Sequence, residues 1–260
     1  MGADGHFSAS QLGMLRRCEQ QFAYRYALGL KRPPSAAMSL GSSFGDGIAY
    51  SLRQKIDSGV DLPTPEVVEI AVTRLEGRKD STEWDEPFTA VKDELPGLVA
   101  VFQKDAAPGI EPAAVEEKVV TRLKPSVGEP FDVLSYLDLR ERDGRVTDLK
   151  TAKRSWPEDR PAAELQPLLY TMAEAGESAF RFLITVRTKT PKIQVLDRAI
   201  TADEKQAATA LVALAKRRAD AIVANPEIAW PTGHGGNLCS KRFCGYWREC
   251  KARWQHAIRD

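Results

Sequence analysis

Apolar residues in the first hundred positions recur every three or four residues, which is the spacing of amphipathic helices. Ser8 and Gln11 form a capping-box pair ahead of the first such series. We therefore predict a helix that starts near Ser8, contains Cys18 and ends near Gly29. Its apolar positions are Leu12, Leu15, Phe22 and Tyr26.

A second apolar series recurs every four residues and stops at Gly59, which favours a helix with a glycine C-cap. Its members are Phe44, Ile48, Leu52 and Ile56. Thr64 with Pro65 predicts the start of a third helix, and residues 98–102 belong to a fourth. The first hundred residues are therefore expected to be mainly helical.

From Val115 onward the apolar runs become short and partly alternating, which is typical of β-strands. The predicted strands are 119–123, 131–140, 145–151, 180–186 and 193–196. One helix is expected over 162–175, stopped by Gly176, and a longer one begins at Thr201 and ends before Asn225. Strands enclosed by helices predict an α/β fold.

The composition is that of an ordinary globular protein, with 260 residues, 43% hydrophobic and 28% charged. No long linker, internal repeat or low-complexity segment divides the chain. We therefore expect one domain over residues 1–260. Its parts would be a mainly helical region at 1–110, a core at 111–200 and a last helix with a Cys-rich tail at 201–260.

Two features of the sequence predict a cytoplasmic protein. No apolar run approaches the roughly 20 residues of a membrane span, and Met1–Ser10 lacks a basic stretch followed by an apolar block. In a reducing compartment, the four cysteines favour metal binding over disulfides. The net charge of +1 decides nothing about nucleic acid, because a local basic patch is enough to bind it.

Two consecutive predicted strands carry charged residues opposite a buried face. Leu137 and Leu139 alternate with Asp138, and on the next strand Asp148 and Lys150 share one face. Two carboxylates could hold Mg²⁺ through oxygen ligands, while the lysine could orient water or stabilise charge that develops on a phosphoryl group. By itself, the D-x-K triplet also fits an exposed ion pair on a surface hairpin.

The loop between these strands decides whether the two aspartates share a face. A two-residue turn of Asp143 and Gly144 would place Asp138 opposite Leu149, with Asp148 on the other face. A three-residue loop that includes the preceding arginine would place Asp138 opposite Asp148. Both the apolar pattern and the proposed chemistry select the longer loop, which predicts a positive φ at Gly144.

The flanking residues add an ordered set of motifs, in which an aspartate ends one strand, D-x-K-T follows on the next and Q-x-x-x-Y lies on a helix. This order resembles the active-site core of the PD-(D/E)XK nuclease superfamily, specifically its RecB-like branch. The resemblance implies a restriction-endonuclease-like core with a central mixed β-sheet flanked by helices. It also implies Asp138 and Asp148 as ligands of Mg²⁺ or Mn²⁺, Lys150 as the catalytic lysine, and Gln166 and Tyr170 along the DNA path or bracing the site.

Further ligands are expected near these motifs. Glu116 or Glu117 resembles the acidic residue that opens the first core strand of the family. Residues 40–45 resemble the family's G-[TS]-x-x-H helix, but Gly45 stands where the metal-binding histidine would be. Two alternatives follow: Asp46 or one of the glutamates completes an all-carboxylate site, or metal binding is weakened. Three histidines fall outside recognisable motifs: His6, His234 and His256.

The cysteines are divided between the two ends of the chain. Cys239, Cys244 and Cys250 lie close together, and Cys18 is far upstream. Such thiolates favour tetrahedral zinc or an iron–sulfur cluster, between which spacing does not decide, and a set of unrelated thiols is the simpler alternative. The division resembles AddB-type and CRISPR-associated RecB-like nucleases, which implies a structural [4Fe-4S] cluster on all four cysteines. The cluster would tie the C-terminal Cys-rich loop, expected over 231–250, to the first helix.

The resemblance as a whole implies a metal-dependent DNA exonuclease acting on single strands or DNA ends in recombination, repair or CRISPR adaptation. Its partners would be DNA and a helicase, recombinase or CRISPR adaptation protein. Arg16, Arg17 and Arg25 would offer positive charge to phosphates. Two alternatives remain, a nuclease-fold protein that binds DNA ends or a partner with little or no cleavage, and a zinc-stabilised interaction protein.

Overall fold

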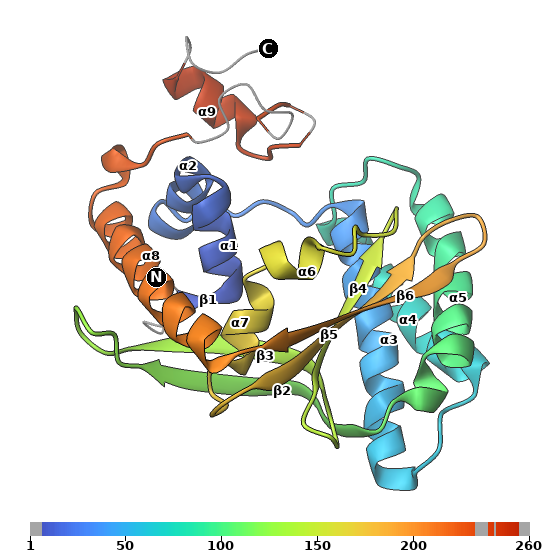
Figure 1. Ribbon diagram of the computed structural model, residues 1–260. Helices are drawn as coiled ribbons and strands as arrows, with labels where there is room; N and C mark the ends of the chain where they lie inside the picture. The colour runs from blue at the N-terminus through green and yellow to red at the C-terminus, as the bar shows by residue number, and fades with distance from the viewer. Residues whose placement is uncertain (1–6, 232–238, 242, 255–260) are drawn as a thin grey trace. The chain divides into compact units, whose positions relative to one another are not determined.

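The computed structural model describes residues 7–231, 239–241 and 243–254 (Figure 1). The chain divides into two compact units. Unit 1 takes in Met1–Arg32, Val120–Ser135 and Asp203–Asp260, and unit 2 takes in Pro33–Val119 and Tyr136–Ala202. The histidines His6, His234 and His256 lie outside the described residues. The assignment of all 260 residues to one nuclease domain stays a prediction.

Unit 2 contains a mixed β-sheet. Its strands are β2 (Pro112–Leu123), β3 (Phe131–Glu141), β4 (Val146–Ala152), β5 (Ser178–Val186) and β6 (Lys192–Ile200), of which β2 and β3 begin or end in unit 1. Strand β3 pairs with β4 antiparallel, β4 with β5 parallel and β5 with β6 antiparallel, while β2 pairs with β3. The parallel and antiparallel pairs confirm the predicted mixed sheet.

Three long helices of unit 2 cover one face of this sheet (Figure 1). They are α3 (Ala36–Ser58), α4 (Thr64–Glu76) and α5 (Phe88–Asp105). The predicted stop of α3 is confirmed, because Gly59 adopts the left-handed conformation with φ 77°. Leu139 and Leu183 bring the sheet into the core formed by these helices. The α/β prediction is therefore confirmed.

Shorter elements complete unit 2. They are η2 (Lys79–Ser81), η3 (Ala107–Gly109), α6 (Arg160–Ala163) and α7 (Gln166–Thr171). The single helix predicted over 162–175 is wrong, since α6 and α7 are separate. Pro167 lies at the start of α7 and has no N–H with which to continue a preceding helix. Helix α7 ends at Thr171, before the stop predicted at Gly176, although Gly176 does have a positive φ of 71°.

Unit 1 is formed by segments from the N-terminal, middle and C-terminal parts of the chain. Its elements are β1 (Phe7–Ser8), α1 (Ala9–Arg17), α2 (Glu19–Phe22), η1 (Ala23–Ala27), α8 (Ala202–Ala224), η4 (Pro226–Ile228) and α9 (Trp247–Arg253). Strand β1 pairs in parallel with the first part of β3. The capping box at the start of α1 is confirmed, because the Ser8 side chain accepts from Gln11 N and the Gln11 side chain accepts from Ser8 N.

The prediction that Cys18 lies inside a continuous helix is wrong. Its backbone is extended, with φ −165° and ψ 114°, and separates α1 from α2. Apolar residues continue at helical spacing on both sides, so the periodicity carries no sign of the break.

The tail also differs from expectation, because its last part forms α9 where a loop was predicted. No described helix is long and apolar enough to cross a membrane.

Candidate active site

The β3–β4 hairpin adopts the register that places its two aspartates together. Leu139 pairs with Thr147, and the same register sets Asp138 opposite Asp148. Gly144 has φ 86°, as the three-residue loop requires. The register predicted from the apolar pattern is therefore confirmed, and both carboxylates lie on one side of the sheet.

Hydrogen bonds hold each of these carboxylates in place. Leu149 N donates to Asp138 Oδ2 at 2.8 Å, and Gln166 Nε2 donates to Asp148 Oδ1 at 2.6 Å. The other oxygen of Asp148, Oδ2, lies 2.5 Å from Lys150 Nζ. The Asp148 side chain is only 1% exposed. The site therefore has two fixed carboxylates and an ammonium group that contacts one of them.

Burial and the neighbouring charges shift the pKa values of Asp138, Asp148 and Lys150. Burial raises the pKa of Asp148 to about 7, opposed by Lys150 and assisted by Asp138. Burial likewise raises the pKa of Asp138, against the ammonium of Lys150. Burial lowers the pKa of Lys150, but the two carboxylates outweigh it and the net shift is upward. Two buried carboxylates side by side are stabilised by added positive charge, which fits the donor set of a hard divalent cation.

Gln166 and Tyr170 lie beside the Asp148 carboxylate, which Gln166 contacts directly. Gln166 Nε2 contacts Tyr170 Oη at 2.7 Å as well as the Asp148 carboxylate, and both residues come from α7. Tyr170 is 8% exposed, and burial raises its pKa. Of the two roles considered for this pair, the contacts favour holding Asp148 in its orientation over lying along a DNA path.

The two candidate glutamates of β2 have different surroundings. Glu116 lines the same cleft as Asp138 and has φ 52°, an unusual conformation for a residue other than glycine. Its carboxylate forms an ion pair with Arg53. Glu117 instead accepts from Arg140 Nε at 2.8 Å. The structure therefore brings Glu116, and not Glu117, to the cleft that Asp138 lines.

Helix α3 forms the other wall of this cleft, whose volume is about 510 Å³. A Cβ at Gly41 would lie 3.1 Å from Thr151 Oγ1, so a glycine allows the close approach of α3 to the end of the D-x-K-T motif. Gly45 faces open space, with nothing within 4 Å of a Cβ built there. Asp46 lines the cleft, but its carboxylate accepts from Arg78 Nη2 at 2.9 Å.

Two arginines that no sequence motif indicates, Arg53 and Arg78, contact the candidate ligands Glu116 and Asp46. Each is a single arginine on or after a helix, and each contacts a carboxylate more than thirty positions away. Neither local spacing nor composition carries a signal for such a contact.

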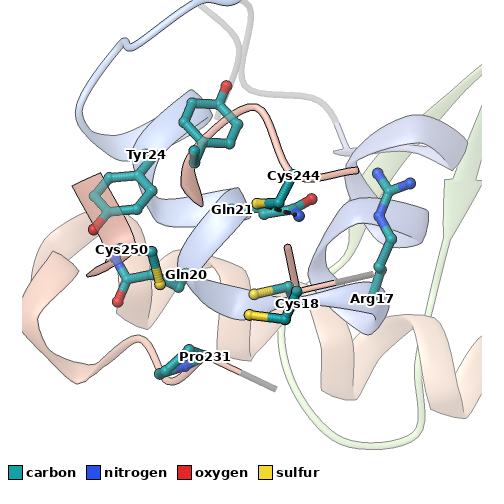
Figure 2. A pocket seen from close by; sticks show the side chains of 10 residues that line it. Arg17, Cys18, Gln20, Gln21, Tyr24, Pro231, Cys244 and Cys250 are labelled. Carbon is teal, nitrogen blue, oxygen red and sulfur yellow. Dashed lines mark hydrogen bonds between the residues drawn. The ribbon is translucent and has the colours of Figure 1, made fainter. Parts of the chain in front are cut away.

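The four cysteines line one pocket in unit 1 (Figure 2). Cys18 reaches it from the α1–α2 junction and Cys250 from α9, while Cys244 accepts a hydrogen bond from Gln21 Nε2 at 3.2 Å. Burial, followed by the neighbouring thiols of Cys18, Cys239 and Cys244, raises the pKa of Cys250 to about 12. Neighbouring buried thiols fit the donor set of a soft metal, whose charge would favour the thiolate. Within the described part of the chain, no group of three or more His, Cys, Asp or Glu residues could hold a single metal ion as arranged.

Of the three arginines expected to offer positive charge, Arg17 lines the cysteine pocket and Arg16 and Arg25 are not among its lining residues. Arg16 and Arg17 are exposed in the last turn of α1, and Arg17 lines the cysteine pocket. Arg25 is half-buried in η1, with its guanidinium 5.7 Å from the ring centre of Tyr26. A contact of these arginines with phosphate stays a prediction.

Comparison with known proteins supports one family. The sequence matches the model of the PD-(D/E)XK nuclease superfamily over residues 6–251. A solved structure from Eubacterium rectale, described as a putative exonuclease, has a TM-score of 0.56 at 12% identity and covers 94% of this chain and 88% of its own. The structure of SSO0001 has a TM-score of 0.31 at 9% identity with 83% of each chain covered, too low to support an argument. No curated protein matches the sequence significantly.

Proposed function

Because the chain belongs to the PD-(D/E)XK nuclease superfamily, we propose that it is a metal-dependent nuclease that hydrolyses phosphodiester bonds in DNA. The observation that carries this proposal is the register of β3 and β4, which sets Asp138 opposite Asp148 with Lys150 on the same face. A surface hairpin with an accidental ion pair would not bury Asp148 to 1% exposure, since an ionised carboxylate is costly to bury without compensation.

Asp138 and Asp148 would hold Mg²⁺ or Mn²⁺, and Glu116, which lines the cleft with Asp138, would be a further carboxylate ligand. Gln166 keeps the Asp148 carboxylate oriented through its 2.6 Å hydrogen bond. Lys150 would donate to a phosphate oxygen as negative charge develops there. The divalent cation, when bound, would lower the pKa of a water molecule and neutralise charge on the phosphate.

The direct test is cleavage of end-labelled single-stranded and double-stranded DNA by the pure protein with Mg²⁺, Mn²⁺ or EDTA. Degradation that depends on the divalent cation supports the proposal. The competing function is a DNA-end or partner-binding module, for which Gly45 in place of the family histidine is the motivating feature. Tight DNA binding with no cleavage under any cation would establish that second function and reject the first.

We further propose an exonuclease that acts on single strands or DNA ends. The support is the fold shared with the Eubacterium rectale protein described as a putative exonuclease and the RecB-like order of motifs. Substrates with the 5′ end, the 3′ end or both ends blocked would separate this activity from an endonuclease. Circular single strands cleaved as fast as linear ones would reject the exonuclease assignment.

A [4Fe-4S] cluster on Cys18, Cys239, Cys244 and Cys250 is proposed as a structural cofactor, with zinc as the alternative. The support is a shared pocket whose four thiols come from both ends of the chain. Broad absorbance near about 400 nm together with iron and acid-labile sulfide would identify the cluster. Colourless protein with one equivalent of zinc would identify the alternative.

A further inference from the structure

We propose that Arg78 is a phosphate-binding residue that positions the nucleic-acid backbone in the active-site cleft, with Asp46 as the group that holds it. The inference rests on the proposed nuclease function, whose cleft it extends. Arg78 follows α4 and lines the cleft together with Asp138 and Lys150. It lies in no motif of the sequence and is separate from the D-x-K-T segment.

The guanidinium of Arg78 is fixed before any substrate arrives. Its Nη2 donates to Asp46 Oδ2 at 2.9 Å, and its Nη1 donates to Ser43 Oγ at 3.2 Å and to Arg74 O at 3.0 Å. Despite these three bonds, the side chain stays 32% exposed. A cation whose geometry is already set loses little conformational freedom on binding a phosphate, so these contacts favour a binding role.

The charges around Asp46 leave an excess of positive charge. Arg74 Nε lies 4.0 Å from the same Asp46 oxygen that accepts from Arg78, and its side chain is 63% exposed. Two guanidinium groups thus contact one carboxylate. By contrast, Arg53 is paired with Glu116, and Lys150 lies beside two carboxylates, Asp148 and Asp138. The group of Asp46, Arg74 and Arg78 therefore has more cations than carboxylates, and Arg78 presents this positive charge to the cleft, where it favours binding of a phosphodiester.

This arrangement also accounts for Asp46. Its carboxylate accepts a charge-assisted hydrogen bond from Arg78, which leaves it less suited to the metal-ligand role predicted from the sequence. The adjacent Gly45 leaves open space, since a Cβ there would meet nothing within 4 Å. Gly45 and Arg78 line the same cleft, so the open space at Gly45 gives room for a phosphate backbone in that cleft. Asp46 is thereby a residue that positions Arg78. Gly45, which stands where the family has a metal-binding histidine, then lies along the path of the substrate.

The test measures binding of fluorescent single-stranded DNA without cleavage, in EDTA, across a series of salt concentrations. Loss of one phosphate contact in Arg78→Gln is expected to weaken binding about tenfold and to reduce the slope of log affinity against log salt by about 0.7. Arg78→Lys keeps the charge and should retain the slope. The matched control is Arg181→Gln, which removes an arginine paired with Asp197 outside the cleft and should change neither quantity.

Two further measurements separate this role from a structural one. Phenylglyoxal labelling of the wild-type protein needs no variant, and DNA should protect Arg78 but not Arg181. Asp46→Asn should weaken DNA binding in EDTA, because it releases the Arg78 guanidinium, whereas loss of a metal ligand would leave binding in EDTA unchanged. An unchanged salt slope in folded Arg78→Gln, or equal labelling of Arg78 with and without DNA, overturns the proposal.

The outcomes distinguish failure of the phosphate site from failure of the proposed nuclease activity. If the wild-type protein binds DNA through Arg78 but never cleaves it, the nuclease proposal fails and the phosphate site stands. If the protein cleaves DNA and Arg78→Gln binds and cleaves like the wild type, the phosphate site fails and the nuclease proposal stands.

Discussion

The aspartate pair in unit 2 and the cysteine pocket in unit 1 are assembled in different ways. Asp138 and Asp148 are ten positions apart on one hairpin, so backbone hydrogen bonds of adjacent strands bring them together. Cys18 and Cys250 come from opposite ends of the chain and share a pocket lined by the α1–α2 junction and the C-terminal segment. The hairpin site is formed by local pairing, while the thiol site depends on long-range closure that a bound metal would strengthen.

The largest expected effect concerns the hairpin. Lys150→Ala should abolish detectable DNA cleavage, a loss of roughly 10³-fold in kcat, because the ammonium acts on charge that develops in the transition state. DNA affinity and the fold should change little. Single-turnover cleavage and thermal unfolding measure these quantities. Lys153→Ala is the matched control, since Lys153 is an exposed lysine paired with Glu86. Wild-type turnover in Lys150→Ala would remove the lysine from the mechanism.

The second effect concerns the thiol pocket. Cys18→Ser should lose the metal cluster and lower Tm by several degrees, since each kcal/mol of lost stability shifts Tm by about 2–4 °C in a domain of this size. Wild-type protein stripped of its metal is the control, and its Tm should fall by the same amount. Iron content and absorbance measure the cluster, and calorimetry measures Tm. A Cys18→Ser protein that keeps full metal content and stability would refute the four-cysteine site.

A smaller effect is expected where the hairpin is braced by a helix. Gln166→Leu removes the hydrogen bonds to Asp148 and Tyr170, and such supporting contacts typically affect metal affinity or activity by about 10- to 100-fold. Tyr170→Phe removes only the contact to Gln166 and should cost less. Cleavage rates titrated against Mn²⁺ compare the two variants. Equal activity of Gln166→Leu and wild type at limiting Mn²⁺ would show that the orientation of Asp148 does not need this bond.

The smallest expected effect is at Gly45. The open space there accepts a side chain, so Gly45→His should fold normally. A site completed by carboxylates should gain nothing from the imidazole, or should lose activity because it occupies the space beside Arg78. A rise in cleavage at low Mn²⁺ would instead identify Gly45 as a lost ligand. Gly45→Ala serves as the control for the helix propensity of alanine at this position.

Several features of this protein followed from the sequence because their physical causes are local. Alternation along β3 and β4, together with a glycine able to take positive φ, selects one hairpin register, and that register confirms the shared face of Asp138 and Asp148. The end of α3 at Gly59 was equally predictable, since a left-handed C-cap is a property of the residue itself.

Other features were decided only by the tertiary structure. Glu116 and Glu117 are adjacent acidic residues, and only the unusual backbone at Glu116 and the ion pair of Glu117 with Arg140 assign one of them to the cleft. The break at Cys18 and the contact of Arg78 with Asp46 are likewise invisible to periodicity. Local patterns report which face of a strand or helix is buried, whereas contacts between distant elements depend on how those elements pack against each other.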